Sequence, residues 1–131
     1  MLIQELLEKY NIKLDIDAIT NNMDPFSICD QMREVNDHYS KMVFLSNRLK
    51  NTEKKLAGEI YLKYKNSGEK FSEKSIESII ATSIDILDVR DQIAEVTALV
   101  SYLDGLREIL RFKLTIINSL MADRRKGLEN E

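Results

Sequence analysis

Basic side chains recur along residues 41–65 at a spacing that suits contact with phosphate groups. Lys41, Arg48 and Lys55 follow one another every seven residues, so one face of a helix would carry all three. The segment holds seven bases and two acids, whereas a solvated helix face usually mixes both signs. We interpret the surplus as a surface for a polyanion, with a merely solvated face as the alternative. The seven candidates are Lys41, Arg48, Lys50, Lys54, Lys55, Lys63 and Lys65.

Aromatic residues lie close to these bases in the sequence. Tyr61, Tyr64 and Phe71 can stack on unpaired nucleic-acid bases where their rings are accessible. Tyr39 has the same ability, but its helical spacing favours a place in the core of the protein. These rings are secondary candidates beside the basic residues.

The sequence does not support a catalytic or metal site. No glycine-rich phosphate-binding motif is present, and Cys29 and His38 are nine residues apart on one expected helix, too far to meet. The carboxylates lack the pattern of an acid–base pair in a pocket. We therefore expect no enzyme, no cofactor and no metal, and we expect Cys29 to be a small apolar residue near the helix seam.

The composition favours a single all-α domain. The chain has 131 residues, of which 44% are hydrophobic and 31% charged, with four glycines and one proline. One cysteine cannot form an intrachain disulfide, which favours a reducing, cytoplasmic setting. No apolar run approaches the ~20 residues of a membrane span, and the start lacks the order of a signal peptide, so we expect no membrane association.

The net charge of −3 conceals an alternation of charged blocks. Residues 1–37 carry −5, 38–74 carry +5, 75–104 carry −5 and 105–131 carry +2. Because salt screens charges beyond about 8 Å, a polyanion near the second block responds to that block and not to the total. A basic surface is therefore compatible with an acidic protein.

Two long helices are expected to position these residues. Asp24-Pro25 is a typical helix start, with Asp at the N-cap and Pro at the first helical position. Ser72 can cap a short helix, and Gly127 follows three bases, which is typical of a helix end. The expected order is an N-terminal arm over 1–24 with a short helix at 2–10 and an extended link at 11–17, a long basic helix over 25–65, a loop and short helix over 66–84, and a long assembly helix over 85–127.

The apolar spacing of both long helices predicts that they pair as an extended helical hairpin. Apolar residues over 28–60, and again over 86–121, alternate steps of three and four, which is the period of a coiled-coil seam. Ser46 and Glu53 interrupt the first seam, and Arg107 interrupts the second.

The second long helix has more apolar surface than one partner helix can cover. Between Leu99 and Leu120 it is apolar on nearly all sides, and such a helix must be buried on several faces. We expect identical subunits to cover it, and head-to-tail contacts would then form a closed ring or an open filament. The alternative is a monomeric bundle in which residues 2–20 and 71–82 fold back. The expected assembly residues are Leu99, Tyr102, Leu103, Leu106, Ile109, Leu110, Ile116, Ile117 and Leu120.

Several features together resemble the UvsY family of phage recombination mediators. They are K-L-D-I-D after a short leading helix, K-K-L-A-G-E-I-Y-L-K-Y-K at the end of the first long helix, a glycine loop, and Y-L-D-G-L-R-E-I-L-R-F-K-L-T-I-I in the last helix, before Arg124-Arg125. The resemblance covers nearly the whole chain in size and in the order of its elements.

This resemblance implies a non-enzymatic factor of homologous recombination and repair. Members bind single-stranded DNA, loosen the single-stranded-DNA-binding protein that coats it, and load a RecA-like recombinase. The resemblance also implies a ring, described as heptameric, formed through the C-terminal part, and action in the cytoplasm of the infected host. Carried over by position, DNA contact falls just before the loop, although residues 58–61 carry no base here. The matching residues are Lys54, Lys55, Lys63 and Lys65.

Two other functions compete with this interpretation. A helical-hairpin chaperone resembling prefoldin would need a strand-forming hairpin between the long helices, and residues 66–83 lack the alternating runs for one. A coiled-coil adaptor without DNA binding would leave the charges without a specific role. Oligomeric state and affinity for DNA distinguish the three functions.

Overall fold

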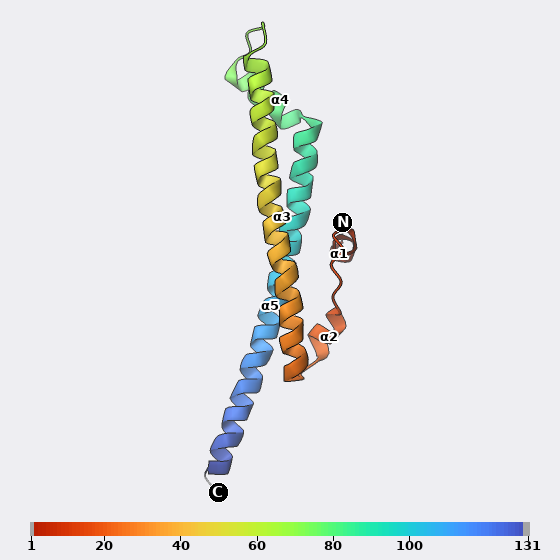
Figure 1. The fold of residues 1–131 in the computed structure, drawn as a ribbon, viewed down its shortest axis with the longest axis vertical. Coiled ribbons are helices and arrows are strands. Elements are labelled where there is room, and N and C mark those ends of the chain that lie inside the picture. Colours follow the sequence, from red (N-terminus) through yellow and green to blue (C-terminus); the bar gives the residue numbers. More distant parts are fainter. Residues whose placement is uncertain (1, 130–131) are drawn as a thin grey trace. The chain divides into compact units, whose positions relative to one another are not determined.

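The computed structural model describes residues 2–129, and every regular element in this range is an α-helix (Figure 1). The helices are α1 (Ile3–Lys9), α2 (Ile16–Asn21), α3 (Pro25–Lys65), α4 (Glu73–Thr82) and α5 (Ile84–Glu129). The predicted all-α class is confirmed, with two long helices and short helices before and between them. Within this range, no helix combines the length and the apolar character that a membrane span requires.

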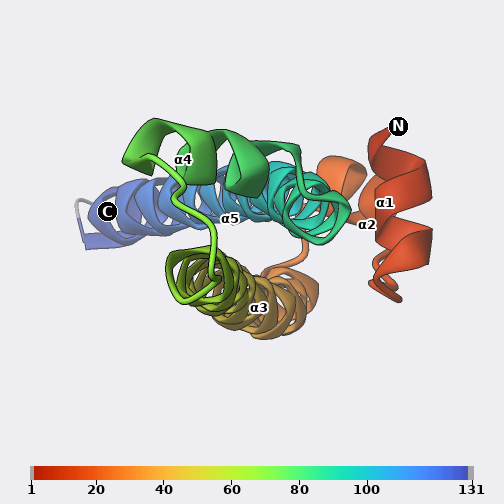
Figure 2. The same ribbon diagram turned by 90° about the horizontal axis from the view of Figure 1, so that it is seen from above.

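The chain divides into two compact units, and each long helix contributes to both. The first, called here the arm unit, comprises Met1–Lys41 and Leu99–Glu131. It contains α1, α2, the first part of α3 and the second part of α5. The second, called the loop unit, comprises Met42–Ala98, in which α4 connects the end of α3 to the start of α5 (Figure 2).

Side-chain caps begin α3 and α4 where the sequence predicts them. The first backbone N–H groups of a helix have no partner inside it, so an oxygen at the N-cap satisfies one of them. A carboxylate oxygen of Asp24 accepts the N–H of Ser27 at 3.2 Å, and Pro25 is the first helical residue. The hydroxyl of Ser72 accepts the N–H of Ser75 at 3.1 Å. Both predicted starts are confirmed.

Two expectations about the ends of elements are wrong. The link over 11–17 is not extended throughout, because α2 begins at Ile16, where the Asp15 carboxylate accepts a backbone N–H of the first turn. Gly127 does not end the last helix, which continues to Glu129, and no glycine in the described range has a positive φ. A glycine can remain helical at a modest cost in free energy, so its presence alone did not fix the boundary.

A left-handed residue ends α1 and turns the chain back. Asn11 has a φ of 55°, a conformation that asparagine tolerates better than most residues. The N–H of Ile12 then bonds to the carbonyl of Leu7 at 2.8 Å, which is the long hydrogen bond of a Schellman motif. Leu7 and Ile12 are both buried, so the turn places the arm's apolar residues in the arm unit's core.

The loop unit has a small apolar core, and an ion pair joins its α3 and α5 segments. Ile76 of α4 is fully buried, as are Ile86 and Val96 of α5. Glu53 of α3 accepts a hydrogen bond from the guanidinium of Arg90 of α5 at 2.8 Å. This contact explains why a carboxylate can interrupt the apolar seam of α3.

The arm unit has the larger core, to which all four of its helical segments contribute. Arg107, which interrupts the seam of α5, donates a hydrogen bond to the amide oxygen of Asn36 at 2.8 Å. Its guanidinium also lies 4.1 Å from the centre of the Tyr39 ring, so this polar residue has partners on α3. The buried apolar residues of this unit are Leu6, Leu7, Ile12, Ile19, Ile28, Val35, Leu99, Leu103, Leu106 and Leu110.

Cys29 differs from its expected role. The side chain is an exposed free thiol, while the neighbouring Ile28 is fully buried. One residue advances a helix by a large angle around its axis, so a residue beside a seam position can face solvent. The expectation that Cys29 packs near the seam is therefore wrong.

Candidate nucleic-acid interface

All seven predicted phosphate-contacting residues are exposed. The apolar seam of α3 faces the core, and this orientation directs the bases of the same helix to solvent. Lys41 belongs to the arm unit, whereas the other six belong to the loop unit. Those six are Arg48, Lys50, Lys54, Lys55, Lys63 and Lys65.

Three of the lysines have neither a carboxylate nor an aromatic partner among the described residues. Within the described part of the chain, no ion pair is found for Lys50, Lys54 or Lys55. An exposed ammonium without a partner can contact a phosphate without first giving up another interaction. These three lysines are therefore free to contact a phosphate, whereas Arg48 and Lys63 also lie next to aromatic rings.

Lys41 is paired within its own helix. Its ammonium lies 2.9 Å from a carboxylate oxygen of Asp37, one helical turn earlier. The hydrogen bond and the positive charge of Lys41 lower the pKa of the Asp37 carboxyl. Both side chains are exposed, so this pair contributes little to stability and a phosphate can compete for Lys41.

Lys65 is held by a residue that the sequence analysis did not identify. Its ammonium and the hydroxyl of Tyr61 both donate to one carboxylate oxygen of Glu73, at 3.2 Å and 3.0 Å respectively. The hydrogen bond from Lys65, followed by that from Tyr61, lowers the pKa of the Glu73 carboxyl. The hydrogen bond to Glu73 raises the pKa of Lys65. The sequence did contain an indication of this partner. Glu73 directly follows the predicted cap Ser72, and the helix that Ser72 caps begins close after Lys65.

Aromatic rings accompany the bases of the loop unit. Phe44, which the sequence analysis did not identify, is 65% exposed, with the Arg48 guanidinium 6.0 Å from its ring centre. The Lys63 ammonium lies 5.6 Å from the ring centre of Tyr64. The predicted candidates Tyr61, Tyr64 and Phe71 are all half-buried.

The predicted assembly residues divide into three groups by burial. Leu99, Leu103, Leu106 and Leu110 are buried within the single chain. Tyr102, Ile116 and Ile117 are half-buried, while Ile109 and Leu120 are exposed. An assembly role for this set stays a prediction, and only the exposed and half-buried members can present surface to another subunit.

The N-terminal arm accounts for the buried group. Leu6, Leu7, Ile12 and Ile19 share one compact core with those leucines, as the fold-back alternative proposed for residues 2–20. Apolar surface nevertheless remains on α5, where Phe112, Met121 and Leu128 are exposed in addition to the predicted residues. The surplus is therefore smaller than the sequence indicated.

An apolar cavity of about 270 Å³ lies within the arm unit, next to this remaining surface. The segment that leads into α3 forms one wall, and the last turns of α5 form the other. It is lined by Met23, Pro25, Ile117, Leu120, Met121 and Arg124.

Lys113 was also missed by the sequence analysis, although it is the most buried cation of the described chain. Its ammonium donates to the carbonyls of Thr20 and Asn22, each at 2.9 Å, and to that of Ile19. These carbonyls lie at the end of α2, where the helix leaves them without internal partners. Nothing in the local sequence distinguishes this lysine from the exposed bases.

A solved structure of similar length has the same architecture. The recombination mediator protein UvsY of bacteriophage T4 aligns with the chain at a TM-score of 0.65, over 97% of this chain and 99% of that chain. The fold is UvsY-like. Sequence identity with UvsY is 12%, so the likeness defines the fold and confirms at that level the resemblance found in the sequence. No protein-family model and no curated protein matches the sequence.

Proposed function

We propose that the chain is a non-enzymatic recombination mediator that binds single-stranded DNA through the outward face of α3 in the loop unit. The unpaired, exposed ammonium groups of Lys50, Lys54 and Lys55 are the observation that carries this proposal. The fold shared with T4 UvsY, itself a recombination mediator protein, supports the biological role. In this role the protein loosens a single-stranded-DNA-binding protein and loads a RecA-like recombinase, in the cytoplasm of the infected host.

Assembly is part of the proposal, because one subunit offers few phosphate contacts. Several identical subunits that present the same bases raise the affinity for a long strand without any new kind of contact. We propose a homo-oligomeric ring, heptameric as the resemblance implies. Ile109 and Leu120, the exposed members of the predicted set, supply apolar contact between subunits.

The double variant Lys54→Ala/Lys55→Ala tests the DNA interface. Fluorescence anisotropy with a labelled single-stranded oligonucleotide, measured over a series of salt concentrations, gives the affinity and its salt dependence. Each phosphate of a single strand that is no longer neutralised lowers the slope of log K against log salt by about 0.7, so we expect a fall of about 1.4 for each participating subunit.

The matched control is Lys9→Ala/Lys13→Ala, which removes two bases from the arm unit and should leave the slope unchanged. An unaltered salt slope in the Lys54/Lys55 variant would show that these two lysines do not contact the DNA. Light scattering on the same samples gives the mass of the particle. A monomer or dimer without affinity for DNA would favour the coiled-coil adaptor instead.

A further inference from the structure

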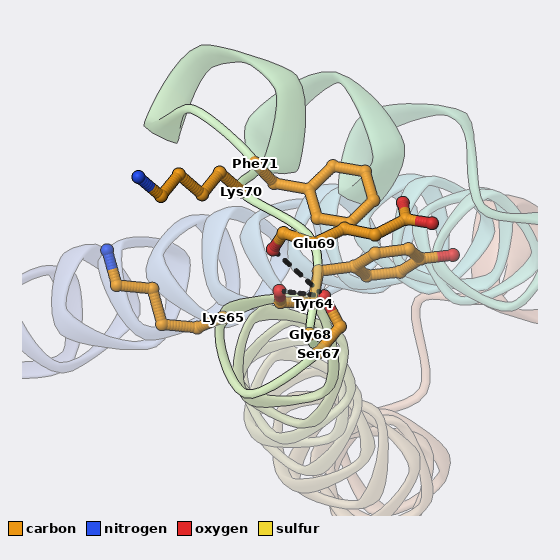
Figure 3. Close-up of a pocket in the computed structure, with 7 residues that line it drawn as sticks. All are labelled: Tyr64, Lys65, Ser67, Gly68, Glu69, Lys70 and Phe71. Carbon is orange, nitrogen blue, oxygen red and sulfur yellow. Dashed lines mark hydrogen bonds between the residues drawn. The ribbon is translucent and has the colours of Figure 1, made fainter.

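The loop that follows α3 forms a pocket of about 410 Å³ with two kinds of wall. Figure 3 shows the side chains of Lys65 and Lys70 extending to one side and the rings of Tyr64 and Phe71 lying on the other. The rings meet edge to face, with centres 5.1 Å apart and planes at 83°. The carboxylate of Glu69, which also lines the pocket, lies on the side of the rings (Figure 3). The pocket therefore places two cationic groups opposite a wall of two aromatic rings and one carboxylate.

The shape of the loop is fixed by its own hydrogen bonds. The hydroxyl of Ser67 donates to the carbonyl of Tyr64 at 2.8 Å and to that of Glu69 at 3.3 Å (Figure 3). Tyr64 also lines a second cavity, of about 390 Å³, on the side of α4. Packing against Tyr64 leaves Phe71 only half-buried, so part of its ring borders open space.

We propose that this pocket holds one nucleotide of the bound single strand, with the base against Phe71 and a phosphate near Lys70. A ligand that fits the rings and the two lysines must combine a planar aromatic group with negative charge. The negative charge must lie on the lysine side, because the Glu69 carboxylate lies beside the rings. Lys70 is exposed, and no ion pair is found for it in the described chain. The bases of α3 lead along the helix to this loop, so a strand that follows them arrives at the pocket. The inference rests on the proposed function and adds recognition of bases to contact with phosphates.

The test compares an oligothymidylate with a strand of equal length in which the bases are absent. Both are labelled and titrated with the full chain by fluorescence anisotropy. Base stacking contributes a factor of about five or more in affinity per base, so the wild type should prefer the strand with bases by at least that factor. Phe71→Leu keeps an apolar side chain but removes the ring, and it should abolish the preference.

Two further variants separate the two walls of the pocket. Lys70→Ala should weaken both strands equally and lower the salt slope by about 0.7 per subunit, with the preference for bases retained. Phe26→Leu is the control, since Phe26 is an aromatic residue of the arm unit that is 83% exposed. Phe26→Leu should change neither the preference for the strand with bases nor the salt slope.

A second test of the pocket keeps an aromatic ring at position 71 and measures fluorescence. The chain has no tryptophan, so Phe71→Trp introduces a single one at the proposed contact. Its emission should be quenched by the strand with bases and not by the abasic strand. Equal affinity of the wild type for both strands, or tryptophan emission of Phe71→Trp that the strand with bases does not quench, would contradict the proposal that the pocket holds a base. Either result would leave the proposed phosphate binding intact. No binding of either strand would overturn the proposed function together with the pocket.

Discussion

The ammonium of Lys113 donates a hydrogen bond to the carbonyl oxygen of Thr20 at 2.9 Å. Ninety-three positions separate the two residues, and the contact joins the end of α2 to α5 inside the arm unit. The carbonyl end of a helix carries partial negative charge, so a buried cation is stabilised there. The N-terminal arm is thus held by a polar contact as well as by its apolar residues.

Lys113→Met should loosen the arm. Methionine approximates the length of the lysine side chain but leaves the carbonyls of Ile19, Thr20 and Asn22 without their donor. We expect the free energy of unfolding to fall by about 2 kcal/mol, measured by urea denaturation. Limited proteolysis should also cut the arm faster. Lys126→Met, at an exposed position, is the control, and equal stability of the two variants would contradict a structural role for Lys113.

Buried and exposed residues of α5 are expected to have different roles. Buried residues should stabilise the fold of one subunit, and exposed residues should contact other subunits. Leu103→Ala removes a fully buried side chain, so it should lower the free energy of unfolding by about 3 kcal/mol. Leu120→Asp changes a side chain that is 57% exposed, so it should reduce the particle mass in light scattering while the helical circular dichroism persists. An assembly unaffected by Leu120→Asp would place the contact between subunits elsewhere.

Glu73 restrains a lysine of the proposed DNA surface. Glu73→Gln removes the charge that holds Lys65, so we expect tighter binding of single-stranded DNA and a salt slope larger by about 0.7 per subunit. Glu77→Gln, which removes a neighbouring exposed acid of α4, controls for the general change in charge. Similar gains in both variants would show that the specific pair is unimportant.

The same pair predicts how pH affects the stability of the loop unit. The pKa of Glu73 is lowered from 4.5, so its contribution is complete above that value and is lost as the pH falls through the lower pKa of the folded state. The pKa of Lys65 is raised from 10.5, so its contribution is lost only as the pH rises beyond that value. The stability difference between wild type and Glu73→Gln should be constant at neutral pH and vanish in acid. A difference that does not decline at all as the pH falls through the acid range would contradict this assignment.

Arg107 should couple energetically to Tyr39. A double-mutant cycle with Arg107→Met and Tyr39→Leu isolates the contact of the guanidinium with the ring, for which we expect about 1 kcal/mol. Denaturant unfolding of the four proteins measures it. Strictly additive single effects would show that Arg107 acts through its hydrogen bonds to Asn36 and Asp104 and not through the ring.

The sequence predicted those features that depend on local pattern. The caps at Asp24 and Ser72 have direct residue signatures, and the seam spacing identified both long helices. Contacts between distant segments have no such signature, and for this reason the partners of Lys113 were not found. The exposure of the predicted bases followed from the seam. Their binding of DNA stays a proposal.

The exposed thiol of Cys29 allows the subunits of the proposed oligomer to be counted. Each polypeptide carries one cysteine, so one maleimide dye can be attached per chain without any engineered residue. The number of photobleaching steps from a single immobilised particle, corrected for the labelled fraction, then equals its stoichiometry.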